Sequence, residues 1–279
     1  MLLVFAKNAF YVAAGFLLGL AIAMGFLYPT SRLVKSIVEE KESRMKETLL
    51  ILGVKKWVHW LSWVITAYIS FLFIAVGMTT ISTRSLLSHS SSAYVFFFYL
   101  FFCSAVIGFS FFLSVFFSKA KLAGIIAPVA LFASILPKWI FFSSNRYEAA
   151  TEKIWASLLP TTAFAFGADI LSDYEYAEIG VHSWNASEGL YSFNLCLTMM
   201  FFDTFFYMVL AWYLEQVLPS QYGIARPFHF PVSSLIRYMR HKFSSTGTSA
   251  DKAIDEGSAS GEDADTERYD HGSRSSYGG

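Results

Sequence analysis

The side chains that could carry chemistry are few in this chain, and the charged ones gather in one short segment. From residue 39 to residue 47 the sequence reads EEKESRMKE, in which acids and bases alternate. Glu40 precedes Arg44 by four residues, and Glu42 precedes Lys46 by four residues. Opposite charges at this spacing pair along a helix and contribute roughly 0.2–0.5 kcal/mol each. A segment of mixed charge suits docking against a protein surface better than binding to anionic lipid, for which a mainly basic helix is typical.

Elsewhere the residue types that usually carry reactions are dispersed. The six histidines include no pair three or four residues apart, and Cys103 and Cys196 lie in separate apolar stretches. These patterns disfavour a metal site and a disulfide. No nucleophile–base motif is present, so no catalytic residue is expected and the chain by itself is not expected to be an enzyme.

The composition indicates a membrane protein. Of 279 residues, 55% are hydrophobic and 15% are charged, whereas soluble domains carry about 25% charged residues. The formal net charge of zero is uneven, because residues 244–279 hold eight acids and three bases. This tail is rich in Ser and Gly and cannot bury enough apolar surface to offset its ordering entropy, so we expect it to be disordered.

Five apolar stretches are long enough to cross a bilayer as helices, which takes about 20 residues each. These stretches are residues 10–28, 58–81, 94–117, 122–142 and 190–217. The expected fold is therefore an all-α membrane protein with five transmembrane helices, in a domain over residues 10–243. The ten phenylalanines in the third stretch are interpreted as mainly a lipid-facing surface.

The basic residues predict the orientation, because cytosolic loops carry an excess of Lys and Arg. The connections 29–57, 118–121 and 218–243 hold 13 of them, and the opposite set of connections holds four. We therefore expect the first set in the cytosol, residues 1–9 outside and the C-terminus inside. A cleaved signal peptide at the start would place the 29–57 loop outside and is less favoured. An odd number of spans with an external start suggests that an upstream portion is missing.

One cytosolic segment, residues 31–53, has the pattern of an amphipathic helix. The apolar side chains on its common face are Val34, Val38, Met45, Leu49 and Leu52. Gly53 can adopt the left-handed conformation that ends a helix. We expect one helix along the cytosolic membrane face. Two readings of it stay open, a simple interfacial anchor and a docking element through which a cytosolic partner moves the spans.

Several motifs follow one another in a recognisable order. They are Glu40-Lys41-Glu42 with Arg44, Lys46-Glu47, Leu52-Gly53 and His59-Trp60; Leu159–Phe164 with Gly167; Phe201–Thr204 with Ala211–Leu214; and Pro219, Tyr222-Gly223 and Arg226-Pro227. This series resembles subfamily A of the ATP-binding cassette transporters and covers roughly residues 10–235. In that family the first motif leads into the intracellular coupling helix. The resemblance therefore implies a coupling role for Glu40, Glu42, Arg44, Lys46, Glu47 and Gly53.

The chain also departs from that family. No Gly is followed by Lys, so the sequence contains no G-x-x-x-x-G-K-[ST] phosphate loop, and no cofactor is expected on this chain. The resemblance implies that ATP and Mg²⁺ bind to a nucleotide-binding domain elsewhere, which works with a second transmembrane half. It also implies a membrane lipid or another amphiphile as cargo, and no nucleic acid partner. The alternative is a scaffold or regulatory protein without an ATP-driven motor, which associates with a full transporter. For either function, the sequence is compatible with the plasma membrane and with an endomembrane.

Four further features call for an interpretation. Asp203 lies near the middle of the last span, either as a polar contact in a substrate or coupling pathway or as a protonated or hydrogen-bonded residue that locks two helices. Lys138 and Glu215 lie near span ends, where both are expected to reach the interface or water. The resemblance implies a re-entrant hairpin in the external connection 143–189, buried against protein. Asn185 begins an Asn-Ala-Ser triplet on the expected external side and is a possible glycosylation site.

Overall fold

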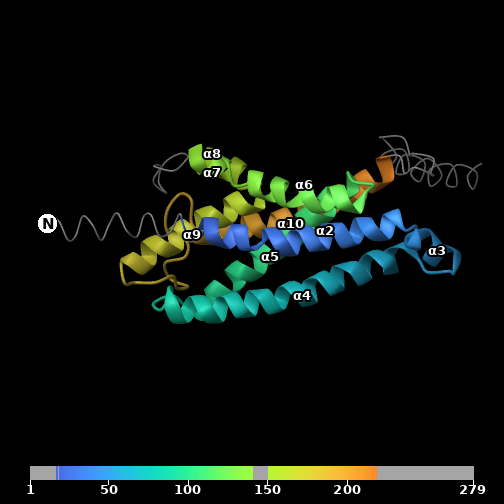
Figure 1. Cartoon of the computed structure of the whole chain (residues 1–279). Helices are drawn as coiled ribbons and strands as arrows, with labels where there is room; N and C mark the ends of the chain where they lie inside the picture. The colour runs from blue at the N-terminus through green and yellow to red at the C-terminus, as the bar shows by residue number, and fades with distance from the viewer. Residues whose placement is uncertain (1–16, 18, 141–149, 219–279) are drawn as a thin grey trace, which may run out of the picture. The chain divides into compact units, whose positions relative to one another are not determined.

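The structure, a computed structural model, describes residue 17 and residues 19–140 and 150–218, all within one compact unit. This part of the chain is helical and contains no strand. Residues 19–25 are helical and lead directly into the first labelled helix. The helices, labelled as in Figure 1, are α2 (Leu27–Glu42), α3 (Met45–Ile51), α4 (Lys56–Ser85), α5 (Ser92–Val115), α6 (Ala120–Ala133), α7 (Pro137–Ile140), α8 (Ala150–Ala156), α9 (Pro160–Tyr176) and α10 (Phe193–Val217).

Four of the described helical segments are long and apolar enough to cross a membrane. They are Trp57–Ser85 in α4, Ser92–Val115 in α5, Ala120–Ile140 in α6 and α7, and Phe193–Val217 in α10. These four confirm the last four apolar stretches as helices. The first stretch, residues 10–28, lies outside the described residues except for residue 17 and the helical residues from 19 onward. The expected N-terminal segment 1–9 and the tail 244–279 also lie outside them.

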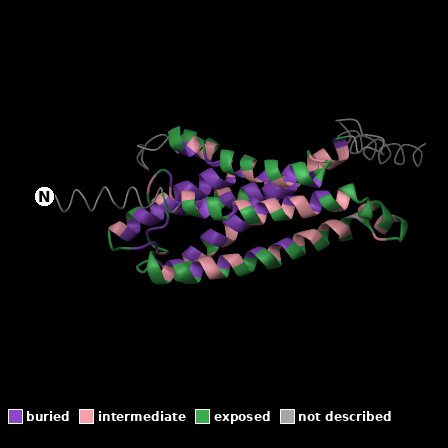
Figure 2. Ribbon diagram, viewed as in Figure 1, coloured by how far each residue is buried: buried purple, intermediate pink, exposed green. Residues whose placement is uncertain are grey.

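α5 is the most buried of these helices and packs against α10, α4, α2 and α9. Phe98 and Phe102 stack on Phe164 of α9, with ring centroids 4.7 and 4.0 Å apart. Phe109 and Phe111 are buried as well. The expectation of a mainly lipid-facing phenylalanine surface is therefore wrong for these four residues, because neighbouring helices cover them, whereas Phe97 and Phe116 are exposed. α4, by contrast, carries mostly exposed and intermediate residues along its length (Figure 2).

The connection 143–189 contains α8 and the largely buried α9, which packs against α10 and α5. Gly167 permits this close packing, since a Cβ atom there would lie 2.4 Å from a ring carbon of Phe98 and 2.8 Å from the sulfur of Cys196. Both Cys103 and Cys196 are free thiols. The helix α9 is thus buried against protein, and the re-entrant hairpin, like its depth in a membrane, stays a prediction.

Candidate functional site

The segment expected to form one helix, residues 31–53, is divided into two helices. α2 ends at Glu42, α3 begins at Met45, and Arg44 between them has a left-handed φ of 55° (Figure 1). This conformation is uncommon for a residue other than glycine, and it ends α2 before α3 begins. The prediction of a continuous helix is therefore wrong. Gly53 has the expected left-handed conformation, with a φ of 93°, directly after α3.

The apolar face of this segment is buried only in its first half. Val34 and Val38 are fully buried in α2, which packs against α5 and α6. Met45 and Leu52 are exposed, and α3 contains no buried residue. α2 continues from the helical residues before it, so its first half extends a preceding helix and does not lie separately along a membrane face. The surface of α3 is open, as a docking element requires.

Two acids at the end of α2 contact the beginnings of two spans. Glu40 accepts a hydrogen bond from Nε1 of Trp63 on α4, and its Oε1 lies 3.6 Å from Nδ1 of His59. Glu42 accepts a 2.8 Å hydrogen bond from the backbone N–H of Ala120, the first residue of α6. A carboxylate at the N-terminus of a helix is stabilised by the unpaired N–H groups and the helix dipole. These acids hold α2 against the starts of α4 and α6.

Two bases of the same segment reach the ends of the other two spans. Nζ of Lys41 donates a 2.8 Å hydrogen bond to the backbone oxygen of Ser114, in the last turn of α5. Lys46 forms an ion pair with Glu215 in the last turn of α10, and each side chain is 20% exposed. Cations near helix C-termini interact favourably with the free carbonyl groups there. The segment 40–46 thus contacts one end of each of the four spans, and we call this set of contacts the junction.

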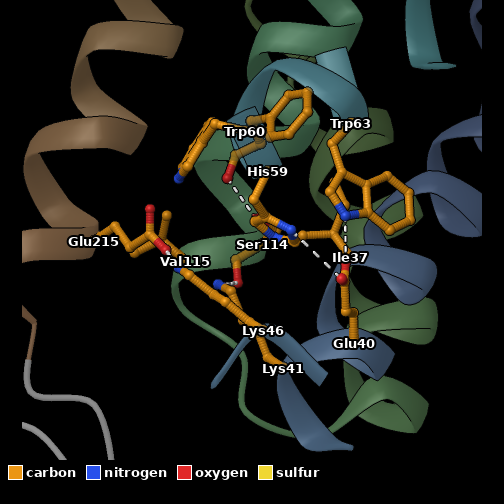
Figure 3. A pocket seen from close by; sticks show the side chains of 11 residues that line it. Ile37, Glu40, Lys41, Lys46, His59, Trp60, Trp63, Ser114, Val115 and Glu215 are labelled. Carbon is orange, nitrogen blue, oxygen red and sulfur yellow. Dashed lines mark hydrogen bonds and ion pairs between the residues drawn. The ribbon is translucent and has the colours of Figure 1, made fainter. Parts of the chain in front are cut away.

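A pocket lies within the junction (Figure 3). Its empty volume is about 390 Å³, counted out to its open side. Trp60 and Trp63 lie on one side of it, and Lys41 and Lys46 enter from the opposite side. Burial lowers the pKa of Lys41 to about 8; the charge of Glu215 opposes this shift and the charge of Lys46 adds to it. The pocket therefore combines an aromatic wall with a cation that is costly to keep charged.

The structure places the other expected coupling residues around the junction. Arg44 forms the turn between α2 and α3, and Glu47 is exposed in the first turn of α3. The sequence did not identify His59, Trp63 and Glu215 as partners of the segment. A weak signal existed for the first two, because they lie one helical turn apart at the start of a span and directly follow the charged segment in the chain.

Asp203 lies apart from the junction, near the middle of α10. Its side chain is fully buried, and neither carboxylate oxygen has a hydrogen-bond partner in the described part of the chain. The expected hydrogen bond to another helix is thus not found there. Both of its proposed roles stay predictions.

The environment of Asn185 argues against the expected glycosylation. The side chain is 1% exposed, its Nδ2 donates to the backbone oxygen of Gly180 at 2.8 Å, and its Oδ1 accepts from the N–H of His182 at 2.7 Å. A glycan is attached to that same nitrogen, so it would displace a buried hydrogen bond and the surrounding loop. Asn185 instead stabilises the turn that it belongs to.

Two residues expected at the surface are paired instead. Lys138 is 3% exposed, forms an ion pair with Asp169 of α9 and lies 4.8 Å from the ring centroid of Phe166. It therefore joins α7 to α9 and is not a snorkelling anchor. Glu215 is held by Lys46 and is not simply solvated. In both cases the partner comes from a distant part of the chain.

The chain matches the family model described as "ABC-2 family transporter protein" over residues 6–213. This match covers most of the chain, and the chain therefore belongs to the ABC-2 family of transporter proteins. Together with the four apolar helices, the match defines an integral, multi-pass membrane protein.

The relatives are members of subfamily A of the ATP-binding cassette transporters, which confirms the resemblance seen in the motifs. The chain is 34% identical over 241 residues to ATP-binding cassette sub-family A member 2 of Rattus norvegicus. It is 35% identical over 233 residues to the retinal-specific phospholipid-transporting ATPase ABCA4 of Homo sapiens and 31% identical over 241 residues to the phospholipid-transporting ATPase ABCA3 of Homo sapiens. These matches cover 82%, 81% and 81% of the chain but only 10%, 10% and 14% of the relatives.

Proposed function

We propose that this chain is the membrane-spanning part of a subfamily A transporter that moves a lipid or another amphiphile between leaflets. ATP and Mg²⁺ bind to a nucleotide-binding domain that is not part of the matched region, and a second transmembrane half completes the transporter. Two observations support the proposal. The family match is to a transporter membrane domain, and two of the relatives are named as phospholipid-transporting ATPases.

The observation that carries the mechanical part of the proposal is the junction. A partner that docks on the exposed surface of α3 displaces the segment 40–46. Because that segment contacts the starts of α4 and α6 and the ends of α5 and α10, its displacement acts on four spans together. Helices transmit such a movement along their length, since each is held by a continuous ladder of hydrogen bonds. The junction therefore couples a cytosolic event to the arrangement of the spans.

Each coupling residue has a distinct part in this proposal. Glu40 and Glu42 connect the segment to α4 and α6, and Lys46 connects it to α10. Arg44 provides the turn that lets α3 leave the line of α2. Glu47 is exposed on α3 and offers a charge to the docking partner.

The test is to replace Glu40, Glu42, Arg44 and Lys46 together with Ala in the complete transporter that contains this chain. We expect lipid-stimulated ATPase activity and lipid transport to fall at least tenfold while expression and membrane insertion remain. The matched control replaces Lys119 and Lys121 with Ala. Both are exposed cations near the same end of the bundle, and this change should leave transport unchanged. Normal coupled activity in the fourfold variant would exclude the coupling role of these residues.

A further inference from the structure

The pocket in the junction lies where three of the spans begin or end. Trp63 follows the first residue of its span, Trp57, by six positions, and Glu215 precedes the last residue of α10 by two. At a helical rise of about 1.5 Å per residue, both lie within roughly 10 Å of the span ends. Ser114 is next to the end of α5. The pocket is therefore at the depth of the phospholipid headgroups and the glycerol backbone.

Lys41 brings a positive charge into this pocket and forms no ion pair within the described ranges, although the charge of Glu215 acts on it from a distance. Its Nζ donates to the backbone oxygen of Ser114, and an ammonium group has three hydrogens to donate. The nearby acids have other partners, since Glu40 binds Trp63 and His59, and Glu215 binds Lys46. Burial makes this charge costly, which the lowered pKa of Lys41 reflects. An anionic group that entered the pocket would compensate that cost.

The opposite wall of the pocket is aromatic (Figure 3). Trp60 stacks on Phe111 of α5 with ring centroids 5.3 Å apart, and Trp63 stands beside it on α4. Tryptophan is favoured at the interface between headgroups and acyl chains because its indole combines a large apolar surface with one N–H group. The pocket thus offers a cation to a phosphate and an apolar wall to the glycerol and upper acyl carbons next to it.

We propose that this pocket binds the phosphate of one phospholipid of the cytosolic leaflet. Lys41 donates to a phosphate oxygen, and the two tryptophans pack against the glycerol region. The bound lipid contacts α2, α4 and α5 and holds the junction together. This is a resident lipid that stabilises the site of coupling, and it goes beyond the transported cargo of the proposed function.

The experiment measures lipid binding to the purified, delipidated full chain in detergent by native mass spectrometry, with dioleoyl phosphatidylcholine as the probe. We expect one phosphatidylcholine to bind in preference to further copies. Lys41→Gln should weaken that binding at least tenfold, whereas Lys41→Arg, which keeps the charge, should retain it within about threefold. The matched control is Lys121→Gln, which removes an exposed cation and should bind like the wild type.

Two further arms separate the possible ligands, and a third locates the bound lipid. Dioleoylglycerol, which lacks the phosphate, should not compete, and equal competition would overturn the role of Lys41. Inorganic phosphate at millimolar concentration should not displace the lipid, and full displacement would show a free-anion site instead. If Lys41→Gln does not fold, a photoactivatable phosphatidylcholine on the wild-type chain gives the answer. Cross-links within residues 37–46, 57–63 or 111–115, which line the pocket, support the proposal, and cross-links confined to other segments contradict it.

Discussion

Neutralising the pair formed by Lys46 and Glu215 should weaken the attachment of α3 to α10 by a measurable free energy. Two unit charges 4 Å apart attract by about 4 kcal/mol at an effective dielectric constant of about 20. Fully exposed pairs contribute a net of only about 0–1 kcal/mol, because solvent screens them and both side chains lose freedom. Each side chain is 20% exposed, so the pair falls between these cases. We expect a coupling free energy of about 1–2 kcal/mol.

The assay is a double-mutant cycle on the purified full chain, followed by reversible unfolding in mixed detergent and dodecyl sulfate micelles. Lys46→Met and Glu215→Gln should each cost about 1–2 kcal/mol, because each leaves a partly buried partner charge unpaired. The double variant should cost less than the sum by the coupling free energy.

The control cycle combines Glu47→Gln with Glu215→Gln. Glu47 is exposed on the same short helix, so these two changes should add within about 0.5 kcal/mol. If the stability losses of Lys46→Met and Glu215→Gln also add, the reasoning is refuted, since the two side chains would then have no coupling free energy.

Two further predictions concern Lys41 and Asn185. Burial lowers the pKa of Lys41 from 10.5 to about 8, so the unfolded chain binds more protons between these values and the native state gains stability as pH rises through this window. In lipid-free detergent, the stability of the wild type relative to Lys41→Met should therefore increase from pH 8 to pH 10.5, and a flat difference would contradict the burial of a charged lysine. For Asn185, removal of N-glycans from the chain made in mammalian membranes should leave its electrophoretic mobility unchanged and equal to that of Asn185→Gln; a faster band after treatment would show that the buried amide is accessible.

The sequence predicted the four described spans because membrane spanning depends mainly on local composition. The stretches expected at 94–117 and 190–217 correspond to helices at Ser92–Val115 and Phe193–Val217, within three residues at every end. Gly53 was predictable for a similar reason, since the left-handed residue at a helix end depends on the backbone freedom of that one position. The order of the motifs was sufficient to predict the family, and the ABC-2 family match and the subfamily A relatives confirm it.

The contacts of the junction could not be predicted in this way. A helical period identifies which residues share a face, but it does not identify what that face meets. Lys46 and Glu215 are 169 positions apart, and they meet only because α3 and the end of α10 lie at the same end of the bundle. The i,i+4 pattern of charges likewise runs through Arg44 without a change, although the chain turns there. The burial of the phenylalanines of α5 could not be predicted either, because composition does not show whether a side chain faces lipid or another helix.

The directions of the four spans explain why the segment 40–46 carries charges of both signs. At this end of the bundle α4 and α6 begin, whereas α5 and α10 end. Helix N-termini carry partial positive charge and C-termini partial negative charge. Glu42 accepts from the backbone N–H of Ala120 at the start of α6, and Lys41 donates to the backbone oxygen of Ser114 at the end of α5. Glu40 and Lys46 bind side chains near the start of α4 and the end of α10. A segment with charges of one sign could not match both the starting and the ending helices. The mixed charge that first suggested a docking surface is therefore also what allows one short segment to hold antiparallel helices together.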